Sequence, residues 1–131
     1  MAFTFVWTVR TGDTDFSGLI YTPTVIDQIV RGMERLFETI DFAPSDAGDR
    51  GILYPAVHVE ANYRGSIGVD DRVTVELTPQ VGAHSITLAA VGRLEETVVF
   101  DGELTLACVD RARMEPIRVP DDIREALAAY E

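Results

Sequence analysis

The sequence contains no lysine, a single cysteine and no long apolar run. The lone Cys108 excludes an internal disulfide, and its apolar, strand-like surroundings predict a buried, inert thiol. No stretch approaches the roughly 18 apolar residues that a membrane-spanning helix needs. The first ten residues alternate like a strand and do not read as a signal peptide. We therefore expect a cytoplasmic protein without membrane association.

With lysine absent, all 11 cationic side chains are arginine, against 22 aspartates and glutamates, and the net charge is -11 at pH 7. Because a protein with this net negative charge repels polyphosphates at long range, we do not expect nucleic acid as a partner. Two explanations of the charge stay open. It is ordinary solubilising charge, with lysine lost through genome composition, or it reflects a salt-rich cytoplasm that screens self-repulsion.

The length of 131 residues fits one domain, 1–131, and a 47% hydrophobic content is enough for a packed core. Apolar residues spaced by three and four predict an amphipathic helix over 24–40, between loops at 11–18 and 41–50. Alternating patterns predict strands at 3–10, 56–64, 72–81, 85–94 and 97–110. A short acidic-capped helix follows residue 120. This order predicts an α+β fold, with one helix on one face of an antiparallel sheet.

The segment Asp13-Thr-Asp15-Phe-Ser-Gly18-Leu-Ile-Tyr21-Thr-Pro23, directly before the long helix, resembles the 4-hydroxybenzoyl-CoA thioesterase family of hotdog-fold proteins. Asn62-Tyr63-Arg64, residues 69–73, the turn at 82–85 and residues 116–120 are also similar to that family. The resemblance covers nearly the whole chain. It implies a hotdog fold, in which a five-stranded antiparallel sheet wraps around the helix. It also implies dimers or tetramers with active sites at the dimer interface, where an acyl-CoA substrate binds.

Asp15 corresponds to the family's catalytic aspartate, which acts as nucleophile or general base. The alternative is that Asp15 only caps a turn, as acids in such loops often do. Asp13 is the weaker candidate and is expected to brace the loop. Gly18 suits a loop whose backbone approaches a ligand. The backbone amides around Thr22 to Thr24 are expected to be unsatisfied at the helix start, and so to form an oxyanion site.

The chain departs from the family pattern at two positions. Many relatives carry a histidine seven residues after the aspartate, and the hydroxybenzoyl-specific ones a tyrosine, whereas this chain has Thr22. Asp15 is therefore expected to act with water and backbone amides alone. Relatives often have an acid fifteen residues after the aspartate, where this chain has Val30. The second departure favours an aliphatic or simple aromatic acyl group over a hydroxylated one.

The other candidate substrate contacts lie around the helix start, in one strand and among the arginines. They are Tyr21, Pro23, Thr24, His58, Arg64, Arg111, Arg113 and Arg118. The arginines are candidates for the CoA phosphates, because an acidic protein needs local cations there. Scattered surface ion pairs explain them equally well. His58 either lines an acyl tunnel of the adjoining subunit or is simply packed and hydrogen-bonded, and His84 is expected to be solvated.

Acyl-CoA thioester hydrolysis is therefore the expected function, with the CoA thioester as substrate and neither a metal nor a bound cofactor. Two alternatives stay open. One is a non-catalytic module that binds acyl-CoA or acyl-carrier protein. The other is an enoyl-CoA hydratase, which is disfavoured because its histidine five residues after the aspartate is replaced by Ile20. We expect a homo-oligomer, since a single chain leaves a sheet edge and half of such a site exposed.

Overall fold

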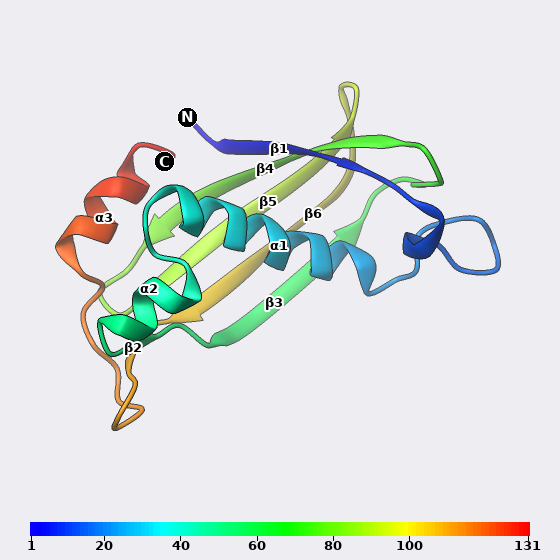
Figure 1. The fold of residues 1–131 in the computed structure, drawn as a ribbon. Coiled ribbons are helices and arrows are strands. Elements are labelled where there is room, and N and C mark those ends of the chain that lie inside the picture. Colours follow the sequence, from blue (N-terminus) through cyan, green and yellow to red (C-terminus); the bar gives the residue numbers. More distant parts are fainter.

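The computed structural model describes all 131 residues and contains one antiparallel five-stranded sheet with one long helix across it (Figure 1). The strands are β1 (Phe3–Thr8), β3 (Ala56–Tyr63), β4 (Arg72–Val81), β5 (Ser85–Leu94) and β6 (Thr97–Ala107). Their order in the sheet is β1-β4-β5-β6-β3. Both β1 and β3 are therefore edge strands.

The long helix α1 (Thr24–Thr39) forms where the apolar spacing predicts it. Its buried stripe presses on the inner face of the sheet and consists of Val25, Ile29, Met33, Leu36 and Phe37. Gly32 lies on the same side, where an added Cβ would collide with the ring of Phe5. A glycine at this position therefore lets α1 approach β1 closely.

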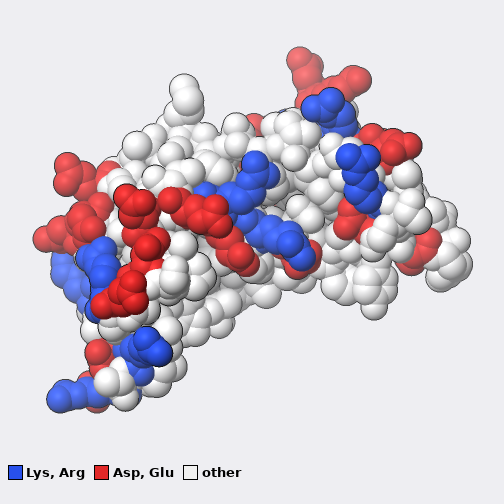
Figure 2. Space-filling model, viewed as in Figure 1, with Lys and Arg blue, Asp and Glu red and all other residues white.

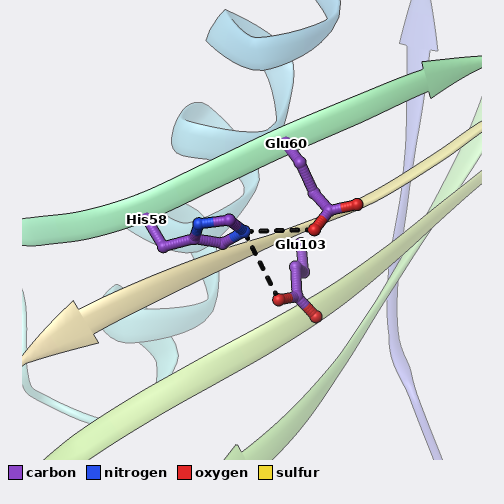
Figure 3. Close-up of side chains that lie close together, drawn as sticks. All are labelled: His58, Glu60 and Glu103. Carbon is purple, nitrogen blue, oxygen red and sulfur yellow. Dashed lines mark hydrogen bonds and ion pairs between the residues drawn. The ribbon is translucent and has the colours of Figure 1, made fainter.

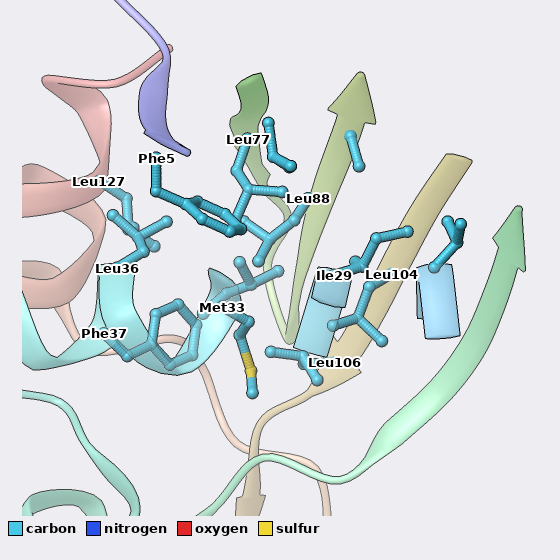
Figure 4. Packing of buried hydrophobic residues seen from close by; sticks show 14 of the residues in the cluster. Phe5, Ile29, Met33, Leu36, Phe37, Leu77, Leu88, Leu104, Leu106 and Leu127 are labelled. Carbon is cyan, nitrogen blue, oxygen red and sulfur yellow. The ribbon is translucent and has the colours of Figure 1, made fainter. Parts of the chain in front are cut away.

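The hydrophobic core lies between α1 and one face of the sheet (Figure 4). Strand residues that point toward α1 are buried and apolar, including Val75, Leu77, Leu88, Leu104 and Leu106. Their sequence neighbours point to the opposite, outer face of the sheet, which carries mainly polar side chains. One face of the sheet is thus packed and the other is open to solvent, as the α+β prediction requires.

Three boundaries differ from the sequence prediction. Residues 41–50 were expected to be a loop but contain the helix α2 (Pro44–Asp49), which begins on Pro44 and is capped by Asp46 accepting the Ala43 amide. The last strand breaks at Cys108, and β7 (Val109–Asp110) pairs instead with β2 (Ile52–Leu53). β1 ends at Thr8, two residues early. Side-chain caps and strand breaks leave weak traces in apolar periodicity, which explains these errors.

The predicted C-terminal helix is α3 (Asp121–Ala128), which buries Ile123 and Leu127. Cys108 is fully buried, as predicted, and burial raises the pKa of its thiol. None of the helices is both long enough and apolar enough to cross a membrane. On the face drawn in Figure 2, arginine side chains lie among the carboxylates and do not gather into one patch.

Candidate active site

The loop that carries Asp15 is a small hairpin that folds back against the start of α1. Thr14 pairs with Ile20, and the Asp15 amide donates to the Leu19 carbonyl oxygen at 3.0 Å. The Gly18 amide closes the turn on the Asp15 carbonyl oxygen at 3.1 Å. Gly18 has a φ of 82° and open space around its Cα, so glycine is needed for the turn conformation.

One oxygen of the Asp15 carboxylate is engaged and the other is free. Its Oδ1 accepts hydrogen bonds from the hydroxyl and the amide of Ser17, the latter at 2.8 Å, whereas Oδ2 accepts none. The Ser17 hydroxyl, and then its amide, hold the pKa of Asp15 below its ordinary value. The turn cap that formed the alternative interpretation is therefore present. This cap leaves Oδ2 ionised and without a hydrogen bond, on a residue that is partly exposed to solvent.

Asp13 braces the loop, as its position predicted. Its Oδ2 accepts the Arg10 amide at 2.8 Å and the Trp7 indole N–H at 3.4 Å. Its carbonyl oxygen accepts the Tyr21 amide at 2.8 Å and the Thr24 hydroxyl at 3.3 Å. Because these bonds join β1, the loop and the helix start, Asp13 fixes where the Asp15 hairpin lies relative to α1.

The amides at the start of α1 are only partly free. The prediction for Thr24 was wrong, because its amide donates to the Tyr21 carbonyl oxygen at 2.8 Å. Pro23 has no amide hydrogen. The amides of Thr22, Val25 and Ile26 donate to no backbone or side-chain acceptor. Donors for an oxyanion at this helix terminus are thus limited to Thr22 and the first turn of α1.

Tyr63 connects the edge strand β3 to this helix start. Its hydroxyl donates a short hydrogen bond to the Thr22 carbonyl oxygen. Partial burial raises the pKa of the Tyr63 phenol, so the proton stays in place. This bond orients the peptide that follows Thr22, although Tyr63 was identified from the sequence only as part of a family motif.

Exposed apolar side chains lie on the Asp15 hairpin and along the edge strand β3. Phe16 is fully exposed at the tip of the hairpin, and Leu19 and Tyr21 are about half exposed. Along β3, Val57, Val59 and Tyr63 are 40–63% exposed although they lie on the α1 side of the sheet. An apolar surface next to a free strand edge is unfavourable in water unless something covers it.

The arginines expected to bind phosphate lie at two ends of the sheet. Arg64 follows β3, beside the beginning of β6, and its guanidinium forms a forked pair with Asp101, with Nε–Oδ2 at 2.9 Å. This pair raises the pKa of Arg64 and lowers that of Asp101. Arg111, Arg113 and Arg118 follow β7 at the far end of β6 and are exposed. Within one chain, therefore, the predicted set does not come together.

His58 lies on the outer face of the sheet, away from α1. It pairs in register with Thr105 of β6, and its Nε2 lies 3.1 Å from Oε1 of Glu60. His58 is therefore hydrogen-bonded and half exposed, and it is directed away from the space between helix and sheet of its own chain. His84 is exposed in the turn at 82–85, as predicted.

An apolar hollow of about 300 Å³ opens at the other end of α1. It is lined by Pro44, Ala47, Ile52, Leu53, Tyr54 and Pro55. The Tyr54 ring packs edge-on against Phe37 at 5.1 Å between centroids, and its hydroxyl bonds to the Phe42 carbonyl oxygen. Because α1 has 16 residues, roughly 24 Å of helix separates this hollow from the Asp15 end.

Comparison with known proteins identifies the family. The family described as "Thioesterase-like superfamily" matches residues 9–127. The chain belongs to this superfamily. It is similar to a 1,4-dihydroxy-2-naphthoyl-CoA hydrolase of Nostoc punctiforme, with 26% identity over 94% of this chain and 84% of that protein. It is also similar to the acyl-CoA thioester hydrolase YbgC of Escherichia coli, with 22% identity over 91% and 92% of the two chains.

A solved structure from the same group has the same fold. A 1,4-dihydroxy-2-naphthoyl-CoA thioesterase from Synechocystis superposes with a TM-score of 0.90 at 18% identity, covering 98% of this chain and 96% of the other. The hotdog fold and the family resemblance inferred from the 13–23 segment are therefore confirmed. The roles of the individual side chains stay predictions that rest on the geometry described above.

Two features of this thioesterase-superfamily site were not predicted from the sequence. The Tyr63–Thr22 bond joins residues far apart in the sequence, and no local pattern signals it. The hollow at 44–55 forms around α2, which was expected to be a loop. The signal for α2 was the pair Pro44 and Asp46, a proline at the first helical position followed by an acid two residues later.

Proposed function

We propose that this chain is an acyl-CoA thioesterase in which Asp15 supplies the catalytic carboxylate. The observation that carries the proposal is the free, ionised Oδ2 of Asp15, on a hairpin held against a helix start with unsatisfied amides. The superfamily membership and the names of the relatives support the reaction class. The net reaction converts an acyl-CoA and water into a carboxylic acid and free CoA.

Two routes use the same carboxylate. In the first, Oδ2 of Asp15 attacks the thioester carbonyl carbon, the C–S bond breaks as CoA thiolate leaves, and water then hydrolyses the mixed anhydride. In the second, Asp15 accepts a proton from a water molecule as that water attacks the same carbon, the C–S bond breaks as the CoA thiolate leaves, and Asp15 then returns the proton to the thiolate or to solvent. In both routes the carbonyl oxygen becomes negative, and the amide of Thr22 with the first turn of α1 stabilises it.

The absence of a histidine at position 22 fits this chemistry. A thiol has a pKa of about 8.5, so a thiolate leaves near neutral pH without strong help from an acid. The first step therefore needs a nucleophile or base and oxyanion donors, but no side-chain acid. Gly18 contributes by permitting the turn that presents Asp15, and Asp13 by bracing it.

Pairing of β3 with β3 of a second copy would complete the site. In an antiparallel pair centred on the middle of β3, Tyr63 of one chain meets residues near Pro55 and Ala56 of the other. The apolar hollow of the second chain, which includes Tyr54 and Pro55, would then lie beside the Asp15 end of the first. The same pairing brings Arg64 toward the partner's arginines that follow β7. A dimer, or a tetramer of two dimers, is thus part of the proposal.

The acyl group is proposed to lie in this apolar space, between Tyr21, Pro23 and Val30 of one chain and the hollow of the other. Val30 is half-buried and packs against the core, so no acid is available there to bind a hydroxylated ring. An aliphatic or simple aromatic acyl group fits these side chains, and the arginines supply the cations for the CoA phosphates. No bound cofactor is required.

The test is hydrolysis of a panel of acyl-CoAs followed with a thiol-trapping reagent. We expect release of CoA from medium-chain acyl-CoAs and benzoyl-CoA, with lower kcat/KM for 1,4-dihydroxy-2-naphthoyl-CoA. The competing function, a non-catalytic acyl-CoA binding module, predicts saturable binding by calorimetry with no CoA release from any member. That result would overturn the proposed activity, whereas a preference for the hydroxylated ring would overturn only the acyl assignment.

A further inference from the structure

The outer face of the sheet carries a compact group of three side chains on the strands β3 and β6 (Figure 3). His58 and Glu60 are two residues apart on β3, and Glu103 is the direct cross-strand partner of Glu60. One possible ligand atom from each residue lies within 4.8 Å of the other two. This group lies away from α1 and has no part in the catalytic proposal.

The two carboxylates in this group lack the arginine partners that the other acids on this face of the sheet have. Four strand acids point outward from the sheet, and two of them have an arginine: Glu76 pairs with Arg93, and Asp101 with Arg64. Glu60 and Glu103 have no arginine, and they stand opposite each other in register. Like charges directly opposite on neighbouring strands destabilise a sheet, so a cation between the two carboxylates would stabilise this pair.

The distances between the groups fit a metal ion. The Nε2 atom of His58 lies 3.1 Å from Oε1 of Glu60 and 3.6 Å from Oε1 of Glu103. Two ligand atoms that each lie about 2.05 Å from a tetrahedral Zn²⁺ are about 3.3 Å apart. The two observed separations bracket that value, so small side-chain movements would bring the three atoms onto one ion.

The backbone holds the group in place and leaves room beside it. Gly102 precedes Glu103, and an added Cβ there would collide with the Glu60 carbonyl oxygen, so the glycine lets β3 and β6 approach closely at this level. The three side chains are 42–51% exposed, which leaves an entry path and a position for water. A hollow of about 320 Å³, lined by Thr78, Gln80 and Thr87 among others, borders Glu103.

We propose that His58, Glu60 and Glu103 form a binding site for a first-row divalent metal ion of the Zn²⁺ type. One imidazole nitrogen and two carboxylate oxygens are ligands that Zn²⁺ accepts, with water in the fourth position. Two ligands come from the edge strand β3 and one from its neighbour β6. The ion therefore cross-links the edge of the sheet and neutralises the opposed carboxylates.

Calorimetric titration of ZnCl2 into the EDTA-treated full-length protein, slightly above neutral pH, tests the site. We expect one ion per chain, and His58→Gln and Glu103→Gln should each weaken binding roughly tenfold or more, since losing even an outer-shell partner costs about that much. His84→Gln and Glu96→Gln are the controls, each an exposed residue of the same type outside the group, and should leave the affinity unchanged. Zn²⁺ should also raise the melting temperature of the unmodified protein but not of His58→Gln.

Three results would overturn the proposal. The first is no Zn²⁺ binding, which would leave His58 only the hydrogen bond to Glu60 that it already makes. The second is an equal loss of affinity in His84→Gln, which would mean scattered surface binding. The third is Mg²⁺ binding as tightly as Zn²⁺ with no dependence on His58, which would mean attraction to the acidic surface only.

Discussion

Tyr63 and Thr22, 41 residues apart in the sequence, are joined by a hydrogen bond from the Tyr63 hydroxyl to the Thr22 carbonyl oxygen. Tyr63 lies at the end of an edge strand, and Thr22 lies between the Asp15 hairpin and α1. The bond therefore links the edge where a second subunit is expected to pair with the residues proposed to carry out hydrolysis. If the proposed dimer forms along this edge, we expect its formation and the organisation of the site to be coupled through this contact.

Replacing Tyr63 by phenylalanine removes the hydroxyl but keeps the ring. We expect the turnover number to fall roughly fivefold, which corresponds to losing one hydrogen bond of about 1 kcal/mol that positions Thr22. The melting temperature should change little. Tyr130→Phe is the matched control, because the Tyr130 ring packs on Phe3 and its hydroxyl makes no hydrogen bond. Unchanged steady-state kinetics in Tyr63→Phe would show that this bond has no catalytic role.

The exposed apolar side of β3 predicts a dimer that depends on that strand. Val59 is 40% exposed on the α1 side of β3, and a lysine there would place a charge in the expected interface. We expect light scattering to show dimers or tetramers for the unmodified protein and monomers with greatly reduced activity for Val59→Lys. Val6→Lys on the other edge strand, at 46% exposure, should keep the oligomer. A fully active monomer, whether of the unmodified protein or of Val59→Lys, would contradict the prediction.

The sequence predicted the parts of the fold that depend on periodic burial. The stripe on α1 and the alternation along β4, β5 and β6 are direct consequences of one packed face, and they placed the ends of these elements to within three residues. The strand order and the register that sets Glu60 opposite Glu103 were not readable, because cross-strand pairing leaves no local pattern. For the same reason, the proposed metal-binding group on β3 and β6 could not be predicted from the sequence.

The candidate catalytic residue was predicted through family resemblance, and its surroundings were not. The 13–23 segment identified Asp15, but only the structure shows that Ser17 holds one carboxylate oxygen and leaves the other free. The helix start was read as a row of free amides. The Thr24 amide is in fact used by Tyr21, since a tight turn precedes α1 and turn hydrogen bonds are not encoded by apolar spacing.

The net charge of -11 predicts that salt stabilises the protein if the charge is an adaptation to a saline cytoplasm. Added ions screen the repulsion among the carboxylates, because the Debye screening length falls to about 3 Å at an ionic strength of 1 M. Thermal melts in low and molar KCl measure this, and we expect a higher melting temperature in molar KCl. An unchanged or lower value would leave genome composition as the explanation for the missing lysine.

The lowered pKa of Asp15 predicts the pH dependence of the reaction. The Ser17 hydroxyl and amide favour the charged carboxylate, so its pKa lies below the ordinary value of about 3.9. The carboxylate is therefore ionised throughout the neutral range, and kcat/KM should stay level as the pH falls until the pH approaches 4. Ser17→Ala should move this acid limb upward. A limb near pH 6 in the unmodified protein would mean that another group controls the rate.

The decisive substitution is Asp15→Asn. Asparagine keeps the size of the side chain, and its Oδ1 can still accept both hydrogen bonds from Ser17, so the hairpin should fold unchanged. The negative charge is lost, and with it the nucleophile or base, so the turnover number should fall by about two orders of magnitude or more. Acyl-CoA binding, measured by calorimetry, should persist or tighten slightly because repulsion with the phosphates decreases.

Asp13→Asn is the matched control, since it removes the same charge from the same loop and weakens the bonds to the Arg10 amide and the Trp7 indole. Equal losses of turnover in both variants would indicate damage to the loop. An active Asp15→Asn would leave Asp15 with only the turn-capping role that its bonds to Ser17 already provide.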